Sequence, residues 1–163
     1  MRENIMKYWL IIFAATALLA ASPVSAEQKT EETSMENKEV IKAAFRAAFD
    51  SDTVREEAVT RYFSRDYIQH VDGKTIGYVQ FIEHLRAQRE TIASFHIEFL
   101  AMASEGDIVF TNHKVRAVKK DGNEIEAKVI AQFTVCNGQI IACDELTRMV
   151  AGSEEDRDLG SRH

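Results

Sequence analysis

Hydrophobic residues recur with helical spacing in two stretches of the chain, and a capping signal predicts a further helix between them. The first predicted helix has six apolar residues at i, i+1, i+4, i+5, i+8 and i+9 of one face: Val40, Ile41, Ala44, Phe45, Ala48 and Phe49. A second helix is predicted from Thr53 to about Phe63, because Thr53 and Glu56 match the Thr-x-x-Glu capping box. A third helix is predicted from Tyr78 to about Arg89.

Beyond Ser94 the hydrophobic pattern changes to the alternation that is typical of β-strands. The strand segments are FHIEFLAMAS, DIVFTNHKVRAVKK, NEIEAKVIAQFTVC and QIIACDELTRMV. Asp121-Gly122 and Asn137-Gly138 separate the last three, and such dipeptides are strong hairpin signals. Helices followed by an antiparallel meander predict an α+β domain with the helices packed on one face of the sheet.

Both ends of the chain are predicted to lie outside this domain. The N-terminus carries Arg2 and Lys7, a 12-residue apolar run and a small-residue site ending at Ala26, a pattern typical of a signal peptide. The run is short against the roughly 20 residues of a membrane span, and a retained N-terminal anchor is the alternative. The predicted organisation is a signal peptide (1–26), a disordered spacer (27–36), the folded domain (37–151) and a polar tail (152–163).

Composition narrows the class of ligand. The formal net charge is −6 and the chain has no basic run. We therefore expect that the protein does not bind nucleic acid and that its mature form does not bind a membrane. A small molecule or a protein is the more suitable partner for an acidic chain. The signal-peptide pattern predicts that the protein is exported and is periplasmic or secreted. The sequence has no phosphate loop, nucleophile triad or cofactor fingerprint, and its histidines lack zinc-site spacing. We therefore predict neither a cofactor nor a metal.

The hairpins predict which residues face one another. A two-residue turn at Asn137-Gly138 would place Glu145 opposite Ile130, and a similar turn at Asp121-Gly122 would place His113 opposite Ile130. His113, Ile130 and Glu145 would then form one row across three strands. In the same register, Cys136 and Cys143 would lie roughly 13 Å apart, too far for a disulfide. We expect two free, buried thiols.

The two faces of the predicted sheet differ in character. The His113 face would carry a mixture of apolar and hydrogen-bonding groups, which suits a ligand pocket: Val109, Thr111, Gln132, Thr134, Ile141 and Cys143. The opposite face would be more uniformly apolar and suits a dimer interface: Phe110, Val129, Ala131, Phe133, Val135, Ile140, Ala142 and Leu146.

Glu145 and His113 are the candidate chemical groups. Their backbones would lie roughly 10 Å apart, a gap that could hold a small ligand or one water. A carboxylate in a partly apolar pocket has a raised pKa, which favours acid/base work near neutrality. The alternative is a buried pair that only supports the fold. His84 is expected to pack or be exposed beside the third helix rather than bind a ligand, and His96 is assigned no role.

From about Asn37 to Arg162 the chain resembles the SnoaL-like branch of the nuclear transport factor 2-like superfamily, which includes polyketide cyclases and ketosteroid isomerase. The resemblance rests on YIQHVDG from Tyr67 to Gly73, EGDIVF before the third-last strand, and NGQIIACDELTRMV at the end. It implies a cone of helices wrapped by a curved, mainly antiparallel sheet, with a pocket in between and usually a homodimer through the sheet.

The resemblance also implies roles for particular residues. Tyr67, Gln69 and His70 would border the pocket, although a solvated connection before the third helix is the alternative. The acid/base residue of the related cyclases would correspond to Glu145. We therefore expect either an acid/base isomerase or cyclase-type enzyme acting on a small, largely apolar molecule, or a non-catalytic binding or dimeric interaction module.

Overall fold

The computed structural model describes residues 23–153 and Asp156. These described residues form three helices and six strands, in the order α1 (Pro23–Phe49), α2 (Glu56–Tyr62), β1 (Phe63–Val71), β2 (Lys74–Gly77), α3 (Tyr78–Thr91), β3 (Ile92–Glu105), β4 (Ile108–Lys119), β5 (Glu124–Cys136) and β6 (Gln139–Ala151). The first and third predicted helices and all four predicted strands are present. β1 and β2, which the hydrophobic pattern did not predict, complete the sheet.

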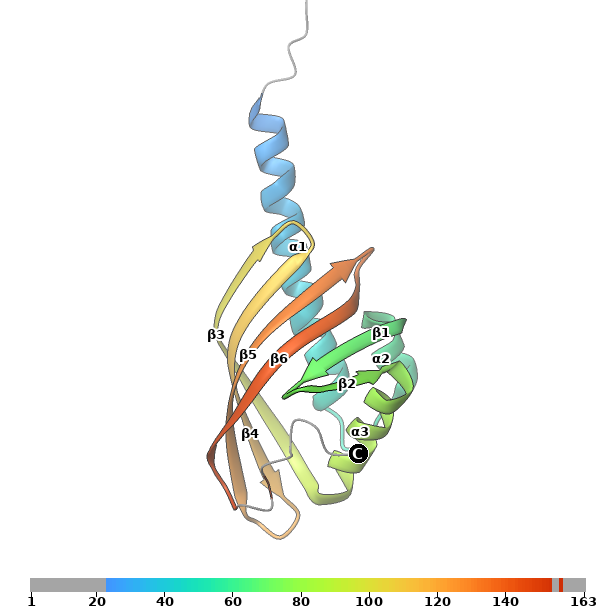
Figure 1. Cartoon of the computed structure of the whole chain (residues 1–163), viewed down its shortest axis with the longest axis vertical. Helices are drawn as coiled ribbons and strands as arrows, with labels where there is room; N and C mark the ends of the chain where they lie inside the picture. Colours follow the sequence, from blue (N-terminus) through green and yellow to red (C-terminus); the bar gives the residue numbers. More distant parts are fainter. Residues whose placement is uncertain (1–22, 154–155, 157–163) are drawn as a thin grey trace, which may run out of the picture.

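The six strands form one curved sheet in the order β2-β1-β6-β5-β4-β3. Strands β3 to β6 are an antiparallel meander, and β1 joins the sheet beside β6 in parallel orientation. The helices pack on the concave side (Figure 1). The predicted α+β class, with helices on a curved and mainly antiparallel sheet, is therefore confirmed.

Helix α1 is longer than the sequence pattern suggested. Its C-terminal part lies against the sheet, and its N-terminal part extends past the end of the sheet (Figure 1). The segment 27–36, for which we expected a disordered spacer, belongs to this helix. The helix is fixed to the β3–β4 turn by Asn37 Nδ2, which donates to the Gly106 carbonyl at 3.0 Å, and by Ser104 Oγ, which donates to the Ser34 carbonyl at 2.9 Å. These contacts anchor a polar segment that has no apolar stripe.

The expected capping box of the second helix is not formed. Helix α2 begins at Glu56 after an extended Arg55, without a side-chain cap. The Glu56 carboxylate instead accepts hydrogen bonds from Arg65 at 3.0 Å and Arg86 at 2.9 Å. The Glu56 side chain therefore pairs with two guanidinium groups rather than forming the predicted capping box. The helix also ends one residue before the predicted Phe63, which starts β1.

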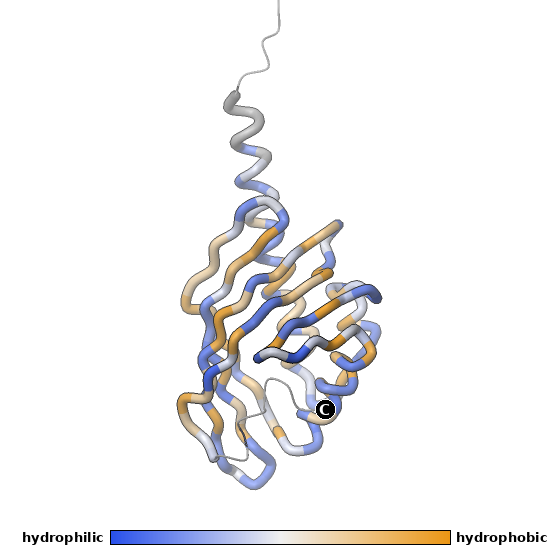
Figure 2. Tube along the Cα trace, viewed as in Figure 1, coloured by the Kyte–Doolittle hydropathy of each residue, from blue (hydrophilic) through white to orange (hydrophobic). Residues whose placement is uncertain are grey.

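The core lies between the concave face of the sheet and the helices. From α1 and α3 come Ile41, Ala44, Phe81, Ile82 and Leu85, and from the sheet come Val109, Val129, Ala131, Phe133, Val135 and Ile140. Hydrophobic and hydrophilic positions alternate along the strands (Figure 2). This alternation turns one set of side chains toward the helices.

The strand registers differ from the predicted ones by one residue at two places. The β4–β5 connection pairs Val118 with Glu124, so its loop has an odd number of residues. In β6, Ile141 is an extra residue between the Thr134–Ala142 and Val135–Ile140 pairs, which is a β-bulge. Each change reverses the sidedness of the residues beyond it, so the two together return His113 and Glu145 to a common face.

The face assignments of β5 were consequently wrong, as were those of Ile140, which is buried, and Ile141, which is exposed, at the start of β6. Val129, Ala131, Phe133 and Val135 point to the helices, and the even-numbered residues of β5 point outward. The outer face still carries exposed apolar side chains, namely Phe110, Ile130 and Leu146. Leu100, Ile141 and Val150 are exposed as well, at irregular positions of β3 and β6. Cys143 is buried and Cys136 is exposed, and both are free. The free thiols were predicted correctly, but burial of Cys136 was not.

Part of the predicted polar tail contacts the domain. The carboxylate of Asp156 is buried, accepts a hydrogen bond from Ser153 Oγ at 2.7 Å and pairs with Lys119 at 3.3 Å. The signal-peptide prediction falls on residues 1–26, most of which lie outside the described residues. No helix in the described part of the chain is long and apolar enough to span a membrane.

Candidate functional site

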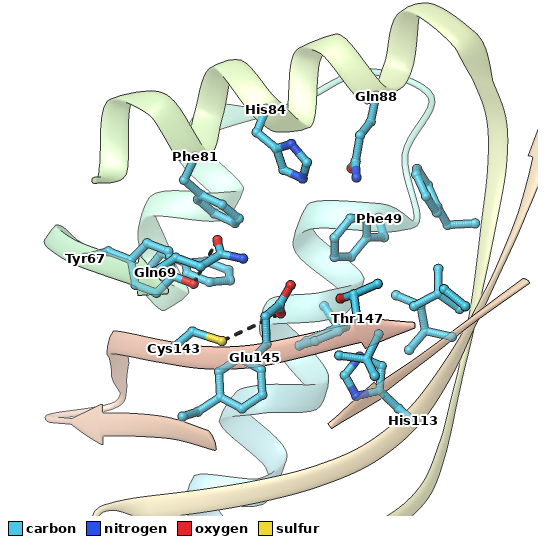
Figure 3. A pocket seen from close by; sticks show the side chains of 18 residues that line it. Phe49, Tyr67, Gln69, Phe81, His84, Gln88, His113, Cys143, Glu145 and Thr147 are labelled. Carbon is cyan, nitrogen blue, oxygen red and sulfur yellow. Dashed lines mark hydrogen bonds between the residues drawn. The ribbon is translucent and has the colours of Figure 1, made fainter. Parts of the chain in front are cut away.

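A cavity of about 90 Å³ lies between the concave face of the sheet and helices α1 and α3 (Figure 3). Most of its lining is aromatic or aliphatic: Phe45, Phe49, Phe63, Tyr67, Phe81, Phe95, Ile97, Val115, Ala127, Val129 and Phe133. The polar lining residues are Gln69, His84, Gln88, His113, Cys143, Glu145 and Thr147. An apolar cavity with a few converging polar groups is the usual composition of a small-molecule site.

Glu145 points into this cavity from β6 (Figure 3). Burial raises the pKa of its carboxyl from 4.5 to about 7, and the charge of Asp72 acts in the same direction. The polar groups of Cys143, Gln69 and Thr147 partly offset this rise in pKa. Within the described chain, Glu145 forms no ion pair with a lysine or arginine. A carboxyl with such a pKa is present in both protonation states near neutral pH.

The neighbours of Glu145 come from β1 and β6, which run side by side. Their parallel pairing sets Gln69 beside Cys143 and Val71 beside Glu145. The Cys143 thiol donates to Glu145 Oε2 at 3.8 Å, and the Tyr67 hydroxyl donates to Gln69 Oε1 at 3.3 Å. Burial raises the pKa of both the Tyr67 hydroxyl and the Cys143 thiol well above their usual values. Both groups are therefore protonated hydrogen-bond donors at neutral pH.

His113 lines the cavity from β4. Its ring is 2% exposed and meets the ring of Phe45 edge-on at 5.2 Å between centroids. Burial, aided by the charge of Lys128, lowers the pKa of His113 from 6.5 to about 4, so the ring is neutral at neutral pH. Its Nδ1 lies 3.0 Å from Thr111 Oγ1. The hydroxyl can donate to Nδ1, which leaves the ring hydrogen on Nε2.

His113 and Glu145 lie in adjacent rows of the sheet rather than in one. Glu145 is opposite Ala131, which also pairs with Thr111, whereas His113 is opposite Val129. The residue that shares the His113 row is Thr147, which also pairs with Val129. The predicted single row through Ile130 is thus replaced by two rows, and both contribute to the cavity.

The structure brings four of the predicted residues to the cavity, namely Tyr67, Gln69, His113 and Glu145. Thr111 is buried behind the lining, where it contacts His113. His70 alternates outward from β1, is exposed, and lies 2.8 Å through its Nδ1 from Thr75 Oγ1. Gln132 and Thr134 lie on the outer side of the sheet because of the register change. These last three are removed from the candidate site.

Sequence reasoning missed His84 and Gln88 of α3, as well as Thr147 of β6, whereas Cys143 lines the cavity from the face on which it was expected. A signal for the first two was present, because Gln88 follows Leu85 by three residues and so extends the apolar stripe of the helix. Both are 5% exposed. The expectation for His84 kept packing and exposure open, and its position in the cavity lining was not anticipated.

The described residues place no group of three His, Cys, Asp or Glu side chains where they could hold a metal ion. The chemistry that the cavity supports with its own side chains is proton transfer and hydrogen bonding.

Comparison with known proteins agrees with the observed fold. The family model of the SnoaL-like domain matches residues 26–143. The chain belongs to the SnoaL-like domain family. Within that match lie most of α1, the elements from α2 to β5 and the start of β6, whereas Glu145 follows it by two residues.

Among proteins similar to this SnoaL-like chain is C11D3.04c of Schizosaccharomyces pombe. It is 31% identical over 128 residues, which cover 78% of this chain and 98% of that protein. The LEH-like epoxide hydrolase of M. tuberculosis has a similar structure, with a TM-score of 0.61, 17% identity and coverage of 71% of this chain and 84% of the other. A candidate SnoaL-like polyketide cyclase from Jannaschia sp. CCS1 gives a TM-score of 0.60 at 17% identity, with coverage of 71% and 87%. These structural likenesses support the fold.

Proposed function

We propose that this SnoaL-like protein binds a small, largely apolar molecule in its cavity and that Glu145 transfers a proton next to a carbonyl group of that molecule. The observation that carries the proposal is a carboxyl group inside a mainly aromatic cavity, without an ion-pair partner in the described chain. With a pKa of about 7, the ionised form can remove a proton from carbon and the protonated form can return one to another atom.

The groups around Glu145 can stabilise the charge that such a proton transfer creates. Removal of a proton beside a carbonyl moves negative charge onto the carbonyl oxygen, which must be stabilised by hydrogen-bond donors. Neutral His113 and the Tyr67–Gln69 pair are the candidates to hold that oxygen. Return of the proton at a new carbon gives isomerisation, and attack of the carbanion on a second carbonyl gives aldol-type cyclisation. Neither reaction needs a cofactor.

The test is exchange of the α-hydrogens of simple cyclic ketones in deuterated water, followed by NMR. The parent protein should accelerate exchange, and Glu145→Gln should lower that acceleration by about 10²- to 10⁴-fold. The exposed Glu90→Gln is the matched control and should exchange like the parent. Unchanged exchange in Glu145→Gln would contradict the assignment of the base.

The second candidate is a non-catalytic binding module. It is favoured by the hydrogen bonds within the lining, since Cys143 donates to Glu145 and Tyr67 donates to Gln69. In that case a ketone would raise the melting temperature of the parent protein without any exchange of its α-hydrogens.

We also propose that the protein is exported, as a periplasmic or secreted protein, and that it forms a homodimer through the outer face of the sheet. The charged, apolar and small-residue order of residues 1–26 supports export. The exposed apolar side chains of that outer face support the dimer. A mass of the mature protein that corresponds to a chain beginning at Glu27 would support cleavage, and an uncleaved chain in the membrane fraction would contradict it.

A further inference from the structure

Helix α3 contributes a second polar end to the cavity. His84 and Gln88 lie one helical turn apart, are each 5% exposed, and point from α3 toward the space above β6 (Figure 3). Glu145 points toward the same space from the opposite side (Figure 3). His84 and Gln88 also make interactions within the chain. Because both side chains line the cavity, their polar atoms can also form hydrogen bonds with a ligand there.

Much of the remaining cavity lining is aromatic. The ring of Phe45 lies 5.7 Å from that of Phe49 and 5.8 Å from that of Phe133, and the ring of Phe81 lies 5.0 Å from that of Tyr67. Such rings pack well against the face or edge of a planar ring. This aromatic lining suits an apolar ring rather than a flexible polar chain.

The charge of the lining selects against anions. Among the described residues that line the cavity, none is a lysine or an arginine, and the one acidic residue is Glu145. A carboxylate or phosphate would lose its hydration without gaining a cation, and its charge would be repelled by an ionised Glu145. An uncharged ligand avoids both costs.

The size of the cavity limits the ligand. Its volume of about 90 Å³ is below the roughly 300–1,000 Å³ of sites for drug-sized molecules. A single ring with short substituents fits this scale.

We infer that the ligand is an uncharged molecule with one ring and two polar groups at opposite ends, and that His84 and Gln88 bind the end remote from Glu145. The inference rests on the proposed function, because it takes the Glu145 end as the place where the carbonyl binds. It adds a specificity contact: α3 selects ligands by their second polar group. The reacting carbonyl is then held at one end of the ring and a hydroxyl at the other.

Calorimetric titration of the full chain with three ring compounds tests this inference, at a pH slightly below neutral. The compounds are acetophenone, 4-hydroxyacetophenone and 4-acetylbenzoate, which share a ring and carbonyl and differ in the second group. We expect 4-hydroxyacetophenone to bind roughly threefold to tenfold more tightly than acetophenone, the contribution of about one added hydrogen bond. The anionic 4-acetylbenzoate should bind most weakly.

Variants locate the contact. In His84→Phe and in Gln88→Met the affinities for the two uncharged compounds should come to within about twofold of each other, because the second hydroxyl loses its partner. Gln132→Met makes the same chemical change on the outer side of β5 and should retain the preference of the parent. Circular dichroism confirms that each variant is folded, and either α3 variant alone is sufficient if the other does not fold.

The outcomes separate this inference from the proposed function. Equal binding of the two uncharged compounds by the parent, or tighter binding of 4-acetylbenzoate, would overturn the two-ended ligand and leave proton transfer by Glu145 standing. A preference that persists in both α3 variants would also overturn it. Absence of saturable binding by all three compounds would overturn both proposals.

Discussion

At the scale of single residues, burial in the cavity shifts the pKa values of two ionisable groups in opposite directions for one physical reason. Burial disfavours the charged form of each group, so the pKa of Glu145 rises to about 7 and that of His113 falls to about 4. Between these values both side chains are mainly neutral. Glu145 and His113 can therefore both act as uncharged hydrogen-bonding groups at about pH 5 to 6.

The raised pKa of Glu145 should make the protein less stable as the pH increases. The unfolded chain releases this proton near pH 4.5 and the folded chain near pH 7, so stability is lost progressively across that interval. The shift corresponds to at most about 3 kcal/mol. Glu145→Gln should remove this loss, whereas the exposed Glu90→Gln should keep it. Urea unfolding at a series of pH values measures the difference, and parallel curves for parent and Glu145→Gln would contradict it.

His113 should make the protein more stable as the pH increases, at pH values below about 6.5. Its folded pKa lies below its unfolded value of 6.5, so the folded state is destabilised as the pH falls from about 6.5 to about 4. His113→Gln should flatten the stability curve in this interval because glutamine does not gain a proton. The exposed His96→Gln provides the comparison, and NMR titration of the His113 ring checks the pKa directly. A ring that titrates near its usual value would refute this explanation.

At the scale of elements, the β-bulge in β6 determines which side chains reach the cavity. Ile141 is the extra residue, and beyond it Cys143, Glu145 and Thr147 face inward. Deleting Ile141 would leave a regular strand in which the residues beyond the bulge keep their partners in β5. We therefore expect a folded protein whose free energy of unfolding is lower by about 1–2 kcal/mol. Its stability should keep the pH dependence that Glu145 produces.

Deletion of Asp144 is the matched comparison, because it removes one residue between two inward-facing positions. Cys143 and Glu145 would become adjacent and could not both point inward. This variant should lose the stability change between about pH 4.5 and 7 that the Ile141 deletion retains. Retention of that change in both deletion variants would mean that the strand restores its register by another route.

The same elements explain how far the sequence could predict the fold. The stripe in α1 and α3 and the alternation in β3 to β6 reflect burial on one face, which periodicity detects directly. In β1, by contrast, inward-facing Gln69 is polar and outward-facing Ile68 is 41% exposed, so the alternation is broken. The odd loop after β4 and the bulge in β6 carry no composition signal, and for this reason Gln132 and Thr134 were placed on the wrong face.

The predicted site residues show the same division. His113 and Glu145 were assigned to one face correctly because two register errors cancelled, not because each hairpin was right. Tyr67 and Gln69 came from the family resemblance and reach the cavity, whereas His70 of the same segment points outward. His84 and Gln88 required the packing of α3 over the sheet, which no local pattern specifies.

At the scale of the whole molecule, the sheet has one face covered by helices and one without a partner in the described chain. Leu146 is 69% exposed on the uncovered face, and Phe110 and Ile130 are each 49% exposed. Groups of exposed apolar side chains of this kind are typical of protein interfaces. We expect these residues to lie at the centre of the proposed homodimer, where each copy covers the other.

Replacing Leu146 by lysine should therefore dissociate the dimer, because two charged side chains would be buried at or near a symmetric contact without partners. Val79→Lys is the matched control: Val79 is similarly exposed, at 68%, but lies on α3 rather than on the sheet. Sedimentation velocity should show a dimer for the parent and for Val79→Lys, and a monomer for Leu146→Lys. Because Glu145 faces the opposite side of β6, the monomer should keep the pH dependence of stability described above. A parent protein that sediments as a monomer would instead leave this face available for a different partner.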